Sequence, residues 1–560
     1  MPFQSRWEVP IPDTSLPSLI FTSPTHPLSK THRSFSDASR PETHYLTTHS
    51  FRLWSQRFAA GLKRSGLQDG DRVLLFSGND LFFPVVFMGI VMAGGIFTGA
   101  NPTYVARELA HQLRDSEARY LICADSQMET GIEAAEMVNM GSERIFVFNG
   151  ELMDGGGKGS HGCAHWGDLV GSVADGERFV WDPLSAPGES DKTIALNYSS
   201  GTTGLPKGVE ISHRNYVSNV IQYLHGASLD PHYGEKLKSA RWLCFLPMYH
   251  AMAQNIFIAG ALMRNTPVYI MSKFDFIQML ESIQKFRITD LILVPPILVA
   301  LAKHPAVKKY DLSSVENIGS GAAPLGREVS EEVEKLWEPG KINVKQGWGM
   351  TETTCSILGW GPNEKSFSFS VGELNANCEA KIMAEDGKTE LGRNARGELW
   401  VRAPNIMKGY WRNPRATRET LTKDRWLKTG DICYVDEYGK FFIVDRKKEL
   451  IKVKGNQVAP AELEALLLEH PGVADAAVIG ITINNDEAPR AYIVPKPNQT
   501  PSGEEIAKFI SGKVSATKRI TGGVVFIDSI PKNPSGKILR KVLRDRAAQE
   551  QRKAQNTSKL

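Results

Sequence analysis

The sequence has 560 residues, of which 41% are hydrophobic and 23% are charged, an ordinary composition for globular proteins. That length allows one large domain and one small domain, with disorder expected only near the two ends. The net charge of +4, from 66 basic and 62 acidic residues, gives no indication of a nucleic-acid partner. The six cysteines lack the spacing of a zinc site, which predicts free thiols in a reducing intracellular compartment.

The first 50 residues are rich in proline, serine and threonine, which predicts an extended arm packed on the body of the protein. No apolar segment of a secretory signal is visible there. Beyond the arm, helical patterns alternate with apolar, β-branched runs. This alternation predicts a layered α/β fold built on a largely parallel sheet.

An uncharged run over residues 81–100 is long enough to be considered as a membrane span. Pro84 and four glycines divide the run. We therefore expect a buried helix that leads into a strand, and no transmembrane segment.

The segment Tyr198–Gly208, YSSGTTGLPKG, has the chemistry of a phosphate-binding loop. Its glycines let backbone N–H groups approach an anion, its hydroxyls add donors, and Lys207 adds a cation. A strand signal precedes the segment, and a strand followed by an amphipathic helix comes after it. A Walker A motif is absent because Gly208 follows Lys207, where serine or threonine is required. The alternative, a polar surface linker, fits poorly between two apolar strands.

Two later strands end in turns of small residues, within VENIGSGAAPLG and KINVKQGWGMTE. Ligands of open α/β sheets bind beyond the carboxyl ends of the strands, so we expect both turns and the phosphate loop to meet at one crevice. The shorter periodicity of residues 379–435 predicts a β-rich subdomain. A charged stretch then separates a body of residues 1–445 from a small domain of residues 446–557, followed by the tripeptide 558–560.

Eight ordered segments together resemble the adenylate-forming superfamily, and within it the acyl-CoA ligases typified by 4-coumarate–CoA ligase and the peroxisomal acyl-CoA synthetases. Besides the phosphate loop they are FLPMYH (245–250), GSGAAPLG (319–326), QGWGMTET (346–353), GELWVRAPNIMKGYW (397–411), KTGD (428–431), VDRKKELIKVKGNQVAPAELE (444–464) and PKNPSGKILRK (531–541). The resemblance implies a large N-terminal adenylate-forming domain of layered α/β sub-domains with a β-rich subdomain, and a small mobile α+β C-terminal domain. It also implies ATP-dependent activation of a carboxylic acid as acyl-AMP, followed by transfer to CoA.

The resemblance assigns nucleotide-binding roles to several of these segments. Thr203 and Lys207 would hold the β- and γ-phosphates, Thr351 would donate to the α-phosphate, and Glu352 would hold Mg²⁺ against phosphate oxygens. Asp431 would accept the ribose hydroxyls, although a turn-capping role is its alternative. The further residues expected at the nucleotide are Ser199, Ser200, Gly201, Thr202, Gly204, Ala323, Gln346, Gly347, Trp348 and Arg446. Trp348 stands where the family usually has tyrosine beside the adenine.

The small domain carries two lysine-bearing loops, and the resemblance implies that it rotates between the two half-reactions. Lys448 would be the hinge and Lys537 would serve adenylation. Lys452, with Lys454 and Gly455, would serve thioester formation.

The acyl pocket is expected to be gated by His250, for which a role in the core is the alternative. Its expected lining includes Ala251, Met252, Ile256 and Cys355. Met252 stands where hydroxycinnamate ligases typically place a tyrosine, so a medium- or long-chain fatty acid or an unsubstituted aryl acid is favoured over 4-coumarate. The alternative functions are loading of a carrier protein and catalytically silent adenylate binding. No carrier domain follows, and Lys537 and Glu352 are both present.

The sequence ends in Ser558-Lys559-Leu560, the tripeptide that the peroxisomal import receptor reads. The preceding residues are polar, which favours an accessible end. The sequence therefore predicts a peroxisomal enzyme whose partners are a small carboxylic acid, ATP, CoA and this receptor.

Overall fold

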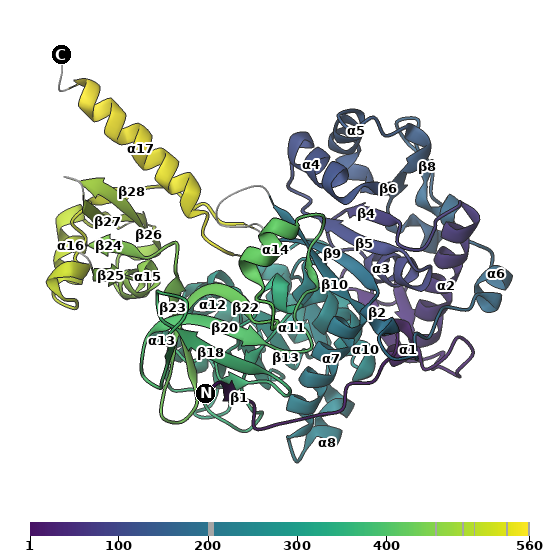
Figure 1. The fold of residues 1–560 in the computed structure, drawn as a ribbon, viewed down its shortest axis with the longest axis horizontal. Helices are drawn as coiled ribbons and strands as arrows, with labels where there is room; N and C mark the ends of the chain where they lie inside the picture. The colour runs from purple at the N-terminus through teal and green to yellow at the C-terminus, as the bar shows by residue number, and fades with distance from the viewer. Residues whose placement is uncertain (200–205, 454–455, 484–485, 498, 534–535, 558–560) are drawn as a thin grey trace.

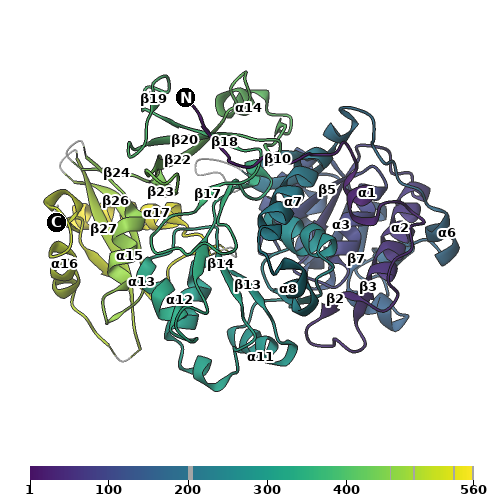
Figure 2. The same ribbon diagram turned by 90° about the horizontal axis from the view of Figure 1, so that it is seen from below.

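The computed structural model describes residues 1–199, 206–453, 456–483, 486–497, 499–533 and 536–557. Figures 1 and 2 show a large body, which holds the N-terminal part of the chain, beside a small C-terminal domain. Within the described residues, no helix combines the length and the apolar character that a membrane crossing requires. All six cysteines are free thiols, as predicted.

The first sheet of the body has eight strands in the order β21-β10-β9-β5-β4-β6-β7-β8. From β9 to β8 the neighbours are parallel, whereas β10 and β21 add antiparallel pairs at the edge. The strands are β4 (Arg72–Phe76), β5 (Ile96–Ala100), β6 (Ala118–Ala124), β7 (Ile145–Phe148), β8 (Ala164–His165), β9 (Thr193–Ser199), β10 (Lys207–Ser212) and β21 (Gly409–Tyr410). Their helices are α2 (Thr48–Arg64), α3 (Phe83–Met92), α4 (Ala106–Ser116), α5 (Met128–Glu136) and α6 (Val173–Arg178). The apolar run at 81–100 is the buried helix α3 followed by β5, as predicted.

The second sheet has seven strands in the order β15-β14-β13-β11-β12-β2-β3, all parallel except the pair β2 and β3. The strands are β2 (Arg33–Asp37), β3 (Tyr45–Thr47), β11 (Trp242–Cys244), β12 (Val268–Ile270), β13 (Asp290–Leu293), β14 (Asn317–Ser320) and β15 (Val344–Gln346). The helices are α7 (His213–Ser228), α8 (Tyr233–Ser239), α11 (Phe276–Phe286), α12 (Pro295–Lys303) and α13 (Arg327–Glu334). In Figure 2 α12 and α13 lie on one side of β13 and β14, and α7 and α8 lie on the other.

The first 50 residues are more ordered than the predicted extended arm. They supply helix α1 (Leu16–Phe21) and the strands β2 and β3, which complete the second sheet. The difference arises because Phe35 and Leu46 are fully buried, so the strands gain apolar contacts that proline and serine content does not reveal.

The helical segment after His250 contains a π-helical stretch. Helices α9 (Ala251–Ala253) and α10 (Ala261–Met263) flank the π-helix η6 (Gln254–Gly260). The buried side-chain amide of Gln254 donates to the carbonyl oxygens of Met248 and Tyr249, at 3.1 Å each. Segments of this kind are frequent at functional sites.

The β-rich subdomain is an antiparallel sheet in the order β1-β18-β20-β22-β23, with β19 paired to β18. Its strands are β1 (Phe3–Gln4), β18 (Glu379–Met383), β19 (Glu390–Leu391), β20 (Gly397–Arg402), β22 (Leu427–Val435) and β23 (Phe441–Arg446). A short pair, β16 (Leu358–Gly359) and β17 (Glu373–Leu374), and helix α14 (Pro414–Thr420) complete this part of the body. The prediction for residues 379–435 is confirmed, and β1 and β23 extend the sheet beyond it.

The small domain has its own apolar core, which includes Leu463, Leu467, Val478, Ile493 and Ile506. Its elements are β24 (Ile451–Val453), β25 (Asn456–Val458), α15 (Pro460–Leu468), β26 (Val473–Ile483), β27 (Asp486–Pro495), α16 (Gly503–Ser511), β28 (Val524–Phe526) and α17 (Arg540–Thr557). Helix α17 projects away from this domain in Figure 1. The exact boundary at residue 445 stays a prediction.

Candidate active site

The carboxylate of Asp431, in the middle of β22, is the centre of a buried polar group. Its Oδ2 accepts a hydrogen bond of 2.8 Å from Nε1 of Trp348, and its Oδ1 lies 3.4 Å from Nε of Arg446. The register of β22 and β23 pairs Asp431 directly with Arg446. Burial raises the pKa of Asp431, while the charge of Arg446 and the bond from Trp348 oppose that rise. Oδ1 accepts no hydrogen bond among the described residues, so a ligand hydroxyl would satisfy it.

Lys537 reaches this group from the small domain. Burial lowers the pKa of its ammonium to about 8, helped by the charge of Arg446 and opposed by the carboxylate of Asp431. The loop is shaped by Gly536, which has a φ of 79°, and a Cβ on that glycine would lie 3.1 Å from Pro296 at the start of α12. The loop thus packs against the body with Lys537 turned toward Asp431 and Arg446.

Lys452 does not share this crevice. It is exposed on β24, which packs against β26 and β27 of the small domain. Lys448 lies in the turn after β23, between the two domains. Lys454 and Gly455 lie outside the described residues.

The two ends of the phosphate loop lie in the neighbouring strands β9 and β10. Ser199 ends β9 and Lys207 begins β10, and the register pairs them opposite each other. The Nζ of Lys207 lies 4.3 Å from the ring centre of Tyr410, whose hydroxyl donates to Oε1 of Glu352 at 2.9 Å. The loop residues Ser200, Gly201, Thr202, Thr203 and Gly204 lie outside the described residues.

Glu352 is buried in the 3₁₀ turn Thr351–Thr353, and its backbone carbonyl accepts from the N–H of Met407 at 2.9 Å. In the part of the chain that the structure describes, no cluster of three or more histidine, cysteine or acidic side chains could hold a metal. A single carboxylate beside phosphate oxygens is, however, a common way to bind Mg²⁺. Glu352 therefore fits that role, with Tyr410 orienting the carboxylate.

Gln346 supports the neighbouring turn with its side-chain amide. Oε1 accepts from the N–H of Leu325 at 2.9 Å, and Nε2 donates to the carbonyl of Leu325 at 3.1 Å. The N–H of Gly347 donates to the carbonyl of Ser320, so the two small-residue turns are tied together. Ala323 lies half-buried in the first turn. The amide of Gln346 is thus occupied by the protein, and its predicted contact with the nucleotide stays a prediction.

Three of the residues predicted for the acyl pocket lie on one helical segment after His250. His250 is the N-cap of α9, so Ala251 and Met252 begin the helix and Ile256 follows one turn later. Sδ of Met252 lies 4.0 Å from the position that a Cβ on Gly321 would take. The helix therefore approaches the turn that follows β14. Cys355, half-buried, follows the turn that holds Glu352.

The surroundings of His250 favour the neutral form of its imidazole. Its ring packs against Tyr249 with centroids 4.4 Å apart, and burial lowers its pKa to about 4. Its Nε2 is buried without a hydrogen-bond partner among the described residues. A neutral imidazole at the acyl end can accept or donate one hydrogen bond without adding charge.

Sequence reasoning missed a buried network behind the site. The amide of Asn197 in β9 donates to the hydroxyl of Tyr216 in α7 and to Oε1 of Gln254 in the π-helix, at 3.2 Å each. Tyr410 was missed as well. Polar residues within otherwise apolar elements were the available signal, since such groups need partners when buried.

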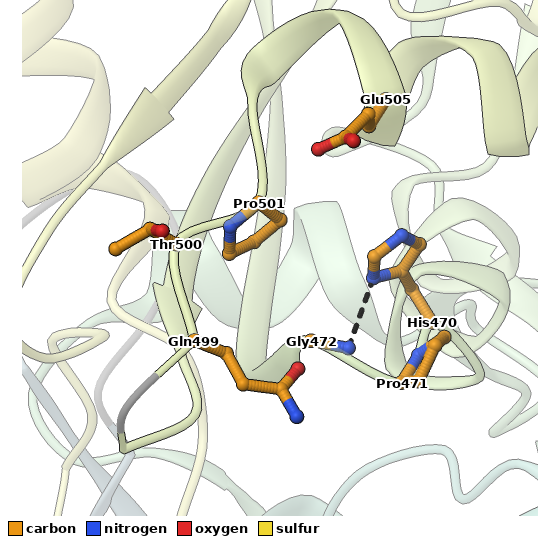
Figure 3. Close-up of a pocket in the computed structure, with 7 residues that line it drawn as sticks. All are labelled: His470, Pro471, Gly472, Gln499, Thr500, Pro501 and Glu505. Atoms are coloured by element: carbon orange, nitrogen blue, oxygen red, sulfur yellow. Dashed lines mark hydrogen bonds between the residues drawn. The ribbon is translucent and has the colours of Figure 1, made fainter.

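A separate hollow of about 410 Å³ lies on the small domain (Figure 3). His470 accepts a hydrogen bond from the N–H of Gly472 at 3.1 Å beside it. Its lining residues are His470, Pro471, Gly472, Gln499, Thr500, Pro501 and Glu505. None of them belongs to the crevice around Asp431.

The fold and the site together define an adenylate-forming enzyme, and the chain belongs to the AMP-binding enzyme family. The model of that family matches residues 26–411, and the model of the AMP-binding enzyme C-terminal domain matches residues 462–537. The chain is an AMP-forming acid–thiol ligase that uses ATP.

Named relatives cover nearly the whole chain. 4-Coumarate–CoA ligase 1 of Petroselinum crispum is 39% identical over 511 residues, which are 90% of this chain and 89% of the relative. Peroxisomal OPC-8:0-CoA ligase 1 of Arabidopsis thaliana is 38% identical over 558 residues, 97% of this chain and 95% of the relative. The crystal structure of ATP-bound MatB from Rhodopseudomonas palustris matches with a TM-score of 0.78 and 25% identity, over 95% of this chain and 98% of that one.

Proposed function

We propose that this ligase activates a medium- or long-chain fatty acid or an unsubstituted aryl acid, and that CoA accepts the acyl group. The observation that supports the proposal is that Sδ of Met252 comes near the turn at Gly321, since we expect the thioether of Met252 to line the acyl pocket. A thioether adapts to flexible apolar groups and cannot pair with a phenol. The names of the relatives include both 4-coumarate and OPC-8:0, so family membership does not choose between acids.

In the first half-reaction, a carboxylate oxygen of the acid attacks the α-phosphorus of ATP. The bond from that phosphorus to the bridging oxygen breaks, and pyrophosphate leaves. We assign Lys537 to the charge that develops there, since its ammonium is buried within the electrostatic influence of Asp431 and Arg446. Asp431 would hold the ribose hydroxyls with Oδ1, which accepts no hydrogen bond among the described residues.

The remaining nucleotide contacts would come from the body. Lys207 would neutralise the terminal phosphates, and Thr351 would donate to the α-phosphate. Mg²⁺, held by Glu352 together with phosphate oxygens, would supply further neutralisation of charge. Trp348 would present its indole face to the adenine while its N–H fixes Asp431.

In the second half-reaction, the sulfur of CoA attacks the acyl carbon, the carbon–oxygen bond to AMP breaks, and the thiol proton passes to solvent. Lys452 is exposed on β24 while Lys537 occupies the crevice. We therefore assign the present arrangement to adenylation. Rotation of the small domain at Lys448 would bring Lys452, with Lys454 and Gly455, to the site for thioester formation.

An acid panel tests the proposal. Hexanoate, dodecanoate, phenylacetate and 4-coumarate would each be supplied with ATP and CoA while pyrophosphate and thioester are followed together. We expect both products from an apolar acid, and Met252→Tyr should shift the preference toward 4-coumarate, with exposed Met137→Tyr as the control. Pyrophosphate without thioester would point to a carrier-protein acceptor. An unchanged acid profile in Met252→Tyr would contradict the assignment of that side chain.

We also propose that the enzyme acts in peroxisomes. The terminal Ser558-Lys559-Leu560 supports this location, as does the peroxisomal relative from Arabidopsis thaliana, although these three residues lie outside the described part of the chain. The test compares full-length protein with protein ending at Thr557, each carrying a fluorescent tag and a flexible linker at the N-terminus. We expect punctate fluorescence only for the full-length protein. Diffuse full-length protein would overturn the proposed location.

A further inference from the structure

Glycine occupies two alternate positions at the carboxyl end of β14, Gly319 within the strand and Gly321 directly after it. Gly319 and the following Gly321 face the side of Met252, because alternate residues of a strand point to the same face. Ile318 and Ser320 are buried on the opposite face. A Cβ on Gly319 would meet no heavy atom within 4 Å, and one on Gly321 would meet only Sδ of Met252 at 4.0 Å. Free space therefore follows the backbone of β14 for two residues.

The neighbouring strands give this strip its walls. The parallel register places Ile292 of β13 and Lys345 of β15 on either side of Gly319. Strands lie about 4.8 Å apart, so the two flanking backbones are roughly 9.6 Å apart across the glycine. Nζ of Lys345 donates hydrogen bonds of 2.9 and 2.7 Å to the carbonyl oxygens of Gly361 and Pro362. These hydrogen bonds hold the end of the lysine side chain away from Gly319. The result is a narrow groove with a backbone floor.

The groove runs away from the nucleotide end of the site. It starts at Gly321, beside Met252, and Gly319 lies about 6.6 Å further on at the usual rise of a strand. Beyond Gly319, the amide of Asn317 donates to Oδ1 of Asp290 at 3.0 Å. This polar pair marks the far end of the apolar stretch. A straight acyl chain that passes Met252 would enter the groove.

We propose that Gly319 opens the acyl pocket for a long, unbranched acyl chain, and that this class is the preferred substrate of the enzyme. The inference rests on the proposed ligase function. A side chain larger than alanine at 319 would fill the groove between Ile292 and Lys345. Each buried methylene group raises the binding constant of the acid roughly fourfold. Closing the space for several methylene groups therefore weakens the binding of long acyl chains strongly and that of short chains little.

The experiment measures kcat/KM for hexanoate, dodecanoate and cinnamate in the full-length enzyme, from acid-dependent pyrophosphate release with ATP and CoA. We expect the wild type to prefer dodecanoate. Gly319→Leu should lower kcat/KM for dodecanoate by 30-fold or more, as an order-of-magnitude expectation, and for hexanoate by about threefold at most. Ile318→Val, on the opposite face of the same strand, is the matched control and should keep the preference of the wild type.

Gly319→Ala covers the case in which Gly319→Leu fails to fold, since its Cβ meets no atom within 4 Å. It should lower the ratio of dodecanoate to hexanoate activity by roughly the value of one methylene, about fourfold. A wild type that prefers hexanoate or cinnamate would overturn the inference while leaving the ligase function intact. An unchanged ratio in both glycine variants would overturn it as well. Absence of pyrophosphate release with every acid would instead overturn the proposed function.

Discussion

The indole Nε1 of Trp348 donates a hydrogen bond of 2.8 Å to Oδ2 of Asp431, 83 positions further along the chain. The aromatic side chain expected at the adenine therefore also fixes the carboxylate expected at the ribose. Asp431 is only 5% exposed, so loss of this donor would leave a second buried oxygen without a hydrogen bond.

Trp348→Phe keeps an aromatic face and removes the donor, so we expect KM for ATP to rise. A hydrogen bond to a charged group contributes about 1.5–3 kcal/mol, which corresponds to roughly 10- to 150-fold. Steady-state kinetics with varied ATP would measure the change. Trp360→Phe is the control, because the buried Nε1 of Trp360 has no partner among the described residues. Equal values of KM in the two variants would show that Trp348 does not position Asp431.

Lys537→Ala should impair adenylation and spare the second step. We expect acid-dependent pyrophosphate release to fall by about 10²- to 10³-fold, while thioester formation from pre-made acyl-AMP is retained. Lys452→Ala should show the reverse, with acyl-AMP accumulating on the enzyme. Quenched-flow analysis of both half-reactions would distinguish the variants. Equal loss in both steps for either lysine would contradict the division of labour.

The adenylation rate should depend on the charge of Lys537. Its pKa is lowered to about 8, so the ammonium is present below that pH and is lost as the pH rises through it. Because kcat/KM reports the free enzyme, we expect kcat/KM for pyrophosphate release to decline above about pH 8. In Lys537→Arg the decline should disappear, since a guanidinium stays charged, whatever the absolute rate. A wild-type profile that is flat to pH 9.5 would contradict this assignment.

Tyr410→Phe should weaken the use of Mg²⁺ without disturbing the packing of the ring beneath Lys207. The change removes the bond of 2.9 Å to Glu352, and we expect the Mg²⁺ concentration at half-maximal activity to rise about tenfold. A magnesium titration at saturating ATP would measure it. Tyr438→Phe is the matched control, because Tyr438 is 79% exposed. Identical titrations for the two variants would remove Tyr410 from the metal site.

Arg540→Ala should destabilise the small domain. Arg540 makes bonds of 2.8 and 2.7 Å to both oxygens of Glu464, and its loss would leave a buried carboxylate unpaired at a cost of about 3–5 kcal/mol. All 11 tryptophans precede residue 446, so tryptophan fluorescence would report on the body and not on the small domain. Hydrogen exchange of β26 and β27 is therefore the suitable measurement.

The loss of stability in Arg540→Ala should shrink at low pH. Burial raises the pKa of Glu464 above its unfolded value, so the folded state binds the proton more tightly and gains stability as the pH falls. Arg546→Ala, which breaks a partly exposed pair with Glu550, is the control and should cost less than about 1 kcal/mol. If Arg540→Ala lowered the free energy of unfolding by no more than this control does, the prediction would be contradicted.

The sequence predicted those parts of the fold that depend on local periodicity. Helix α3, strand β5 and the β-rich subdomain follow from the spacing of apolar residues, and the turns at Gly321 and Gly347 meet because parallel strands end at one edge. The π-helix was not predictable, because it depends on where the amides of Gln254 and Asn255 find buried partners. Such partners come from elements distant in the sequence.

The groove at Gly319 shows the same limit within the site. A glycine in a strand can mark a bulge, a close approach of backbone or an opening, and only the neighbours decide among them. At Gly319 the register with Ile292 and Lys345 indicates an opening. The register across a parallel sheet cannot be read from the sequence of one strand. Trp348 and Asp431 were both predicted at the nucleotide, but their direct hydrogen bond was not.

The pairing of β1 with β18 has a consequence for synthesis of the protein. Phe3 pairs with Ala380, 377 positions further along the chain, and Gln4 pairs with Glu379, 375 positions further along. At about 5–20 residues per second, a ribosome needs roughly 20–75 s to cover that distance. Throughout this interval the first strand has no edge to join, and the aromatic side chain of Phe3 stays available to chaperones. Phe3 and Gln4 are therefore among the last residues of the body to reach their partners.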